Sequence, residues 1–191
     1  MEAYKIFPKA LSEEECDYIA SEAEKLLNID EATLGENTER DVRAKIRSGK
    51  TGFIESSNWN HTVLWNYASS RLWNYVNEAN RTSFGFDISY LSNIQYTIYE
   101  PPGDHYDWHI DTFIDTPNAY QRKLSMTVQL SNDWEYEGGD FELNQAGLES
   151  TDIRTKGTVL IFPSFLLHRV KPVSKGVRKT LVAWFEGKAF K

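Results

Sequence analysis

The stretch KGTVLIFPSFLLHRVKPVSKGVRKTLVAWFE, residues 156–186, decides the fold class of this chain. It contains three runs of aliphatic, β-branched and aromatic residues, at 158–162, 168–170 and 178–185, and proline or glycine separates each run from the next. Short runs of this composition between turn residues predict β-strands. The C-terminal end of the chain is therefore expected to be a sheet with tight turns.

The same pattern of short strand-forming runs between turn residues begins at residue 91. Proline and glycine punctuate it at 101–103 and 138–139, and further strand-forming runs lie at 94–99, 106–111, 124–130 and 140–143. Many short strands with frequent turns are typical of a double-sheet jelly roll or another β-sandwich.

The N-terminal part has helical patterns instead. Residues 11–27 begin with Ser12 and, three positions later, Glu15, the signature of a capping box, and continue with apolar residues at helical spacing. A second helix is expected at 62–80, where apolar residues fall on one face. Residues 30–58 are polar and charged, which predicts a long loop or an irregular hairpin. The expected fold class is thus α+β, with N-terminal supporting helices and a core that is a jelly roll (double-stranded β-helix) or another β-sandwich.

Length and composition limit the alternatives. A chain of 191 residues with 40% apolar residues fits one domain, 1–191, with helical support over about 1–90 and the jelly-roll core over about 91–191. The net charge of −7 disfavours a nucleic-acid partner. No apolar run approaches the roughly 18 residues of a membrane span, and residues 1–9 lack the apolar core of a signal peptide, so no membrane partner and a cytoplasmic location are expected. The single cysteine, Cys16, leaves nitrogen and oxygen as the expected ligands of any metal.

Three residues of the C-terminal half form a candidate metal site. His109 and Asp111 are two apart on an expected strand, so both project from one face, and His168 lies on a later strand. Two histidines and one carboxylate form the facial triad that leaves open positions on non-haem Fe(II). An H-x-D pair alone is weak evidence, because polar surface strands often contain one. His105 and Asp107 form a second such pair of the same strand parity, and the chemistry of the residues does not separate the two.

Arg178 is a candidate anchor for a co-substrate. Oxidation at iron with dioxygen needs two electrons from a co-substrate, and a metal-chelating keto acid also needs its distal carboxylate bound. Arg178 begins an expected strand ten residues after His168, where its planar guanidinium could bind a carboxylate with two hydrogen bonds. Strand alternation places Thr180, Val182 and Trp184 on the same face.

With these residues assembled, the chain resembles the 2-oxoglutarate and Fe(II)-dependent oxygenase superfamily and, within it, the prolyl 4-hydroxylase-like group. The resemblance covers nearly the whole chain and rests on several motifs in order. The family pattern places a glycine six residues and a tyrosine three residues before the first iron histidine, which Gly103 and Tyr106 satisfy for His109 but not for His105. Further motifs are Gly138-Gly139-Asp140-Phe141, the segment 156–164 that leads to His168-Arg169-Val170, and Pro172-Val173-x-x-Gly176-x-Arg178.

The resemblance implies roles for single residues. His109, Asp111 and His168 are expected to hold Fe(II), and Arg178 to bind 2-oxoglutarate. Tyr99 and Thr180 are expected to add contacts to this co-substrate. Some relatives carry a further co-substrate tyrosine on the strand that here covers 124–129, which has none, so the hydrogen bonds to 2-oxoglutarate are expected to differ.

The implied activity is hydroxylation of an aliphatic carbon by dioxygen, with release of succinate and CO₂ and with ascorbate as a candidate reductant. The carboxylate of Asp111 favours hydroxylation over halogenation. The expected substrate is a peptidyl proline in a protein or peptide, extended across a groove between residues 38–53 and the iron site, where a tryptophan could stack on the ring: Trp59, Trp134 or Trp184.

Three rivals remain. A hydroxylase of a free amino acid or small metabolite needs the same iron and co-substrate residues. A nucleic-acid demethylase of the superfamily would carry a second arginine where this chain has Trp184. A non-catalytic jelly-roll binding module does not require the four residues His109, Asp111, His168 and Arg178 together.

Overall fold

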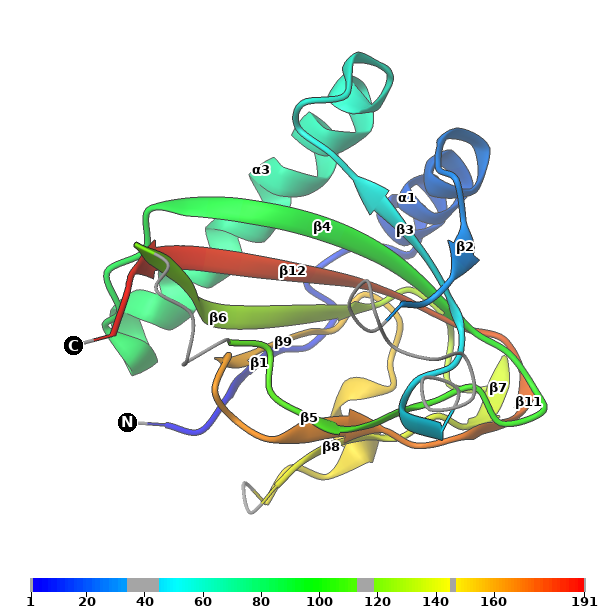
Figure 1. Cartoon of the computed structure of the whole chain (residues 1–191). Helices are drawn as coiled ribbons and strands as arrows, with labels where there is room; N and C mark the ends of the chain where they lie inside the picture. The colour runs from blue at the N-terminus through cyan, green and yellow to red at the C-terminus, as the bar shows by residue number, and fades with distance from the viewer. Residues whose placement is uncertain (1, 34–44, 113–118, 145–146, 191) are drawn as a thin grey trace.

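The computed structural model describes residues 2–33, 45–112, 119–144 and 147–190. Two long helices and two layers of β-sheet make up this part of the chain (Figure 1). The predicted α+β class, with N-terminal helices and a jelly-roll core, is confirmed by this arrangement.

Helix α1 spans Glu13–Leu26 and begins at the capping box that the sequence predicts. The backbone N–H of Glu15 donates to Ser12 Oγ at 3.2 Å, and the N–H of Ser12 donates to the Glu15 carboxylate at 2.9 Å. Its buried face carries Cys16, Ile19 and Ala23. Two of the backbone N–H groups that have no partner within the helix are thereby satisfied, which favours a helix start at this position.

Helix α3 spans Thr62–Ala79, preceded by the 3₁₀ turn η1 at Trp59–His61 and followed by the π-helical turn η2 at Asn80–Phe84. Gly85 ends this segment in the left-handed conformation, at φ 71°. Every apolar residue of the expected helical face is buried: Leu64, Ala68, Leu72, Val76 and Ala79. Both helices cover the same side of the large sheet (Figure 1). None of the helices in the described ranges combines the length and apolar character needed to cross a bilayer.

The large sheet has seven antiparallel strands in the order β1-β9-β6-β12-β4-β3-β2. Their bounds are β1 Lys5–Phe7, β9 Val159–Pro163, β6 Tyr120–Gln129, β12 Arg178–Lys188, β4 Tyr90–Tyr99, β3 Lys50–Ile54 and β2 Asp30–Glu31. The long central strands β6, β12 and β4 are mostly buried because helices cover one face and a second layer covers the other.

The second layer is a smaller sheet on the side away from the helices (Figure 1). It consists of β5 (Tyr106–His109), β10 (His168–Val170) and β8 (Phe141–Leu143), in the order β5-β10-β8. A two-stranded ribbon of β7 (Tyr136–Gly138) and β11 (Val173–Gly176) extends it, and the 3₁₀ turn η3 spans Ser150–Ile153. Apolar residues between the layers form a second core, apart from the one under the helices.

Several boundaries differ from the prediction. The expected strand 106–111 ends at His109, while the strands expected at 124–130 and 178–185 are longer, beginning at Tyr120 and ending at Lys188. Strands β1, β2, β3, β7 and β11 were not expected, because strands of two to five residues carry too little periodicity and exist through pairing with a neighbour. In the 30–58 region, β2 pairs with β3 as an irregular hairpin, and residues 34–44 lie outside the described residues.

Candidate active site

A cavity of about 390 Å³ lies between the two sheets. Strands β4, β6, β9 and β12 of the large sheet and β5, β8 and β10 of the smaller one contribute side chains to its wall. All six residues that the sequence analysis assigned to iron and co-substrate line it: His109, Asp111, His168, Arg178, Tyr99 and Thr180. The fold thus brings together residues that span 82 positions of the chain, from 99 to 180.

Strand pairing places the candidate metal ligands side by side. His109 on β5 lies opposite His168 on β10 in the register, and their rings are 4.1 Å apart between centroids. Asp111 lies just after β5, where its N–H donates to the carbonyl of Ser164 at 2.8 Å. Its carboxylate oxygens are 3.6 Å from Nε2 of each histidine, and the ligand atoms of the three residues all lie within 4.8 Å of one another.

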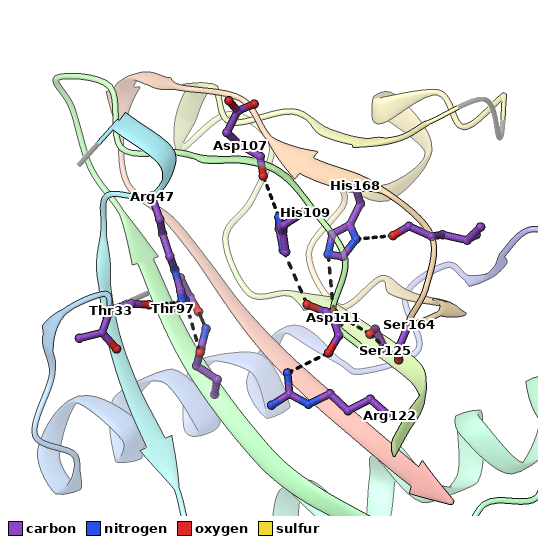
Figure 2. A network of polar contacts seen from close by, with 12 residues as sticks. Thr33, Arg47, Thr97, Asp107, His109, Asp111, Arg122, Ser125, Ser164 and His168 are labelled. Carbon is purple, nitrogen blue, oxygen red and sulfur yellow. Dashed lines mark hydrogen bonds and ion pairs between the residues drawn. The ribbon is translucent and has the colours of Figure 1, made fainter. Parts of the chain in front are cut away.

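Hydrogen bonds orient each ligand (Figure 2). Nδ1 of His109 is 2.7 Å from the carbonyl oxygen of Asp107, and Nδ1 of His168 is 2.8 Å from that of Leu166. A carbonyl oxygen only accepts, so each Nδ1 carries the hydrogen and each Nε2 keeps its lone pair for a metal. The Ser125 hydroxyl donates to Asp111 Oδ2 at 2.6 Å.

The electrostatics of the three residues suit a divalent cation. Burial, with the neighbouring His168, lowers the pKa of His109 to about 4, so this imidazole is neutral near pH 7. Burial acts to raise the pKa of Asp111, but His168, His109 and the Ser125 hydroxyl outweigh it and keep the pKa below its usual range. Two imidazole nitrogens and one carboxylate on one side of a cavity match the Fe(II) facial triad.

Arg178 has the surroundings of an anion-binding residue. Its side chain is 3% exposed, and its Nε is buried without a hydrogen-bond partner. Its guanidinium faces the ring of Tyr99, its register partner on β4, at 5.6 Å. In the described part of the chain no carboxylate forms an ion pair with it. A buried guanidinium without a counter-ion is costly, so a carboxylate entering the cavity would relieve that cost.

The structure also separates the two H-x-D pairs. The ring nitrogens of His105 contact the carbonyl oxygens of Gly103 at 2.9 Å and Lys45 at 3.1 Å. Neither His105 nor Asp107 lines the cavity, and among the described residues only His109, Asp111 and His168 form a group suited to a metal ion. His105 therefore connects the backbone at Gly103 to the backbone at Lys45 by hydrogen bonds and is not a metal ligand in this arrangement.

Two arginines of the cavity were missed. Arg47, which precedes β3, lies over the ring of Tyr106 at 4.5 Å, and Arg122 on β6 lies over the ring of Trp184 at 4.0 Å. Arg122 falls before the expected strand 124–130 and was given no role, whereas Arg47 lies in the segment 38–53 that was expected to border the substrate groove, although this residue was not singled out. An arginine that leads directly into an apolar strand was the available signal for Arg122.

The three candidate stacking tryptophans have different environments. Trp184 lines the cavity and is 7% exposed. Trp59 and Trp134 are 87% and 77% exposed and do not line the cavity, so of the three only Trp184 is placed to stack on a ring bound there.

Comparison with known proteins identifies the class. The model of the 2OG-Fe(II) oxygenase superfamily matches residues 94–186, the segment that carries the histidines, Asp111 and Arg178. The chain is similar to this superfamily over that segment, just under half of its 191 residues, and to proteins named PKHD-type hydroxylases.

Individual relatives agree with this placement. The chain is 43% identical over 86 residues to a PKHD-type hydroxylase of Synechococcus sp. (strain CC9311), covering 42% of this chain and 36% of that protein. The match therefore spans about a third of the relative's length. The viral collagen prolyl hydroxylase of Paramecium Bursaria Chlorella virus-1, solved with 2OG, has the same fold, with a TM-score of 0.71, 19% identity and 97% coverage of both chains. A prolyl hydroxylase of Trichoplax adhaerens, solved with a hypoxia inducible factor peptide fragment, gives a TM-score of 0.72 at 18% identity, covering 97% of this chain and 84% of that one.

Proposed function

We propose that this protein is a 2-oxoglutarate- and Fe(II)-dependent dioxygenase that hydroxylates an aliphatic carbon and releases succinate and CO₂. The observation that carries the proposal is that a facial triad and a buried arginine without a counter-ion line one cavity. Fe(II) and 2-oxoglutarate, when bound, would supply the electrons that activate dioxygen, the oxidant, toward a C–H bond.

The chain's own residues would bind and orient these components. His109, Asp111 and His168 would hold the Fe(II) at the wall of the cavity that they line. Arg178 binds the distal carboxylate of 2-oxoglutarate, and Tyr99 and Thr180 line the same wall. Phe141, Phe162 and Val170 supply an apolar wall that restricts water around the bound co-substrate: they line the cavity and belong to the inter-sheet core.

For the substrate, we propose a peptidyl proline. Phe53 and Ile110 line the cavity and are 43% and 39% exposed, which places apolar side chains where the cavity meets solvent. Trp184 lines the wall and offers an aromatic surface for a proline ring. A structurally similar enzyme was solved with a peptide fragment, which supports a peptide as the substrate class. The groove expected next to residues 38–53 includes 38–44, which lie outside the described residues.

The test is a coupled assay. The purified protein is loaded with Fe(II) without oxygen and then given air, 2-oxoglutarate and a library of proline-containing peptides, while succinate and the mass gain of one oxygen are followed. We expect both products, and we expect both to be lost in the His168→Ala and Arg178→Gln variants. Succinate with oxidation of a small molecule but no peptide would retain the dioxygenase and reject the peptide substrate. No succinate under any condition would reject the enzyme.

A further inference from the structure

The cavity contains more positive charge than the proposed co-substrate can neutralise. Among the described residues, three guanidinium groups line it, those of Arg47, Arg122 and Arg178, against the one carboxylate of Asp111. Fe(II) and the 2-oxoglutarate dianion carry opposite charges of equal size, so their binding leaves the balance unchanged. The loaded cavity keeps two net positive charges, three minus one. Unpaired charges in a partly buried site favour an anionic ligand.

Arg122 lies toward the other end of β12 from the co-substrate anchor, Arg178. Its guanidinium lies over the ring of Trp184, which is six residues beyond Arg178 on β12. Six strand residues at about 3.3 Å each separate the backbone positions of Arg178 and Trp184 by roughly 20 Å. A keto acid whose distal carboxylate is bound by Arg178 therefore leaves the Arg122 guanidinium, beside Asp111, for a different molecule.

Arg122 is held in place without being neutralised. Its guanidinium lies on Trp184, and one N–H contacts the carbonyl oxygen of Asp111 at 3.4 Å (Figure 2). Glu186, its partner in the strand register, instead accepts a hydrogen bond from the Tyr90 hydroxyl at 2.7 Å. Within the described ranges Arg122 forms no ion pair.

Arg47 is likewise oriented by neutral groups. It donates to the carbonyl oxygen of Thr33 at 3.1 Å and to Gln95 Oε1 at 3.4 Å. The buried amide nitrogen of Gln95 donates to Thr97 Oγ1 at 2.7 Å, which fixes its oxygen toward Arg47. Neutral acceptors set the direction of a guanidinium but leave its charge, and Nε of Arg47 is buried without a partner.

Arg47 also lies next to the metal ligands. It covers Tyr106, whose ring stacks on that of His109 at a centroid distance of 3.4 Å and an angle of 11°. We propose that Arg47 and Arg122 form a binding subsite for a carboxylate of the substrate, beside the carbon that is hydroxylated. This inference rests on the proposed function and narrows its substrate class to molecules with a carboxylate near the reacting carbon. The carboxylate belongs either to an acidic residue next to the target proline or to a free amino acid.

Binding and turnover together test the subsite. The probes are two blocked peptides that differ only in Asp or Asn next to a proline, and free L-proline against L-prolinamide. Their affinities for the protein loaded with Fe(II) and 2-oxoglutarate are measured without oxygen by calorimetry, and their KM values in air. We expect the acid of at least one pair to bind more than tenfold tighter than its neutral partner, because hydrogen bonds to charged groups contribute about 1.5–3 kcal/mol each. The pair that shows the preference identifies the source of the carboxylate.

Variants distinguish loss of the carboxylate subsite from a general loss of folding or co-substrate binding. Arg122→Gln and Arg47→Gln should each abolish the preference for the acid and leave the KM for 2-oxoglutarate within about twofold, and Arg122→Lys should restore part of the preference. Arg81→Gln, at a side chain that is 72% exposed outside the cavity, is the matched control. Equal binding of acid and neutral probes, or a preference that survives both variants, overturns the subsite even if succinate forms. Absence of succinate with the preference intact rejects only the proposed activity.

Discussion

The carboxylate of Asp111 depends on a serine that no metal-site motif contains. Ser125 on β6 donates to Asp111 Oδ2 at 2.6 Å and lies 2.9 Å from the hydroxyl of Ser164. Groups that orient metal ligands in this way typically change metal affinity 10–100-fold when removed. We predict that Ser125→Ala weakens Mn(II) or Fe(II) binding by about this factor, measured by anaerobic titration against a competing chelator. Ser70→Ala, at an exposed position of α3, is the control. Equal affinities of the two variants would contradict the role of Ser125.

The single cysteine is expected to be unreactive. Cys16 is 0% exposed, and burial raises the pKa of its thiol to about 12. Because the thiolate is the nucleophile, the folded protein at pH 8 has almost none of the reactive form. We predict that iodoacetamide leaves Cys16 unmodified in the native protein and modifies it fully in denaturant, as followed by intact mass. Comparable labelling rates in both conditions would show that α1 opens easily.

The individual site residues could be predicted to different degrees. The triad and Arg178 lie in motifs with fixed spacing, so their types and order were enough to find them. Arg47 and Arg122 belong to no such motif. Arg122 reaches the cavity because β6 pairs with β12, and Arg47 because β3, which it precedes, pairs with β4 and Arg47 itself bridges to Tyr106. Sequence spacing contains no information about which strands are neighbours in a sheet.

Among the secondary-structure elements, the helices could be predicted and the short strands could not. Helices α1 and α3 are set by local features, a capping box and a repeating apolar face, that are complete within each segment. Strand β1 has three residues and pairs only with β9, more than 150 positions later. Its existence depends on that distant partner, which the local sequence does not reveal.

The turn before β9 requires glycine at position 157. Gly157 has φ +81°, and an added Cβ would clash with the carbonyl oxygen of Leu11, whose N–H donates to the Gly157 carbonyl at 3.1 Å. Gly147 also has a positive φ, +66°, but nothing lies within 4 Å of its Cβ position. We predict that Gly147→Ala lowers the free energy of unfolding by about 1 kcal/mol and Gly157→Ala by more than about 3 kcal/mol. Urea unfolding measures both. Equal losses would mean that backbone conformation alone, and not the contact with Leu11, requires glycine at 157.

For the whole molecule, net charge and local charge have opposite signs. The chain carries −7 overall, while the cavity wall carries three arginines and one carboxylate. Composition could not reveal the positive cavity, because its arginines are spread from residue 47 to 178. The prediction of one domain over 1–191 remains untested, although β1 and β2, from the N-terminal part, join the same sheet as β12.

The molecule has two apolar cores with different neighbours. One joins the helices to the large sheet and includes Leu72, which is 0% exposed. The other lies between the sheets and includes Phe162, whose ring is 4.7 Å from that of His168 and lines the cavity. Only the core between the sheets contacts a metal ligand. A truncation in the core under the helices should therefore lower stability without weakening metal binding, whereas one between the sheets should lower both.

Truncation of one residue from each core tests this separation. We predict that Leu72→Ala lowers the free energy of unfolding by about 2–5 kcal/mol and Phe162→Ala by about 3–5 kcal/mol. At a temperature where both variants stay folded, only the Phe162 variant should bind Fe(II) more weakly, because His168 loses the ring that packs against it. Phe162→Leu removes the aromatic ring but keeps most of the side-chain volume, so it tests the same contact with a smaller loss of stability. Urea unfolding and anaerobic metal titration measure the two effects, and an equal loss of metal affinity in Leu72→Ala would show that the two cores act as one unit.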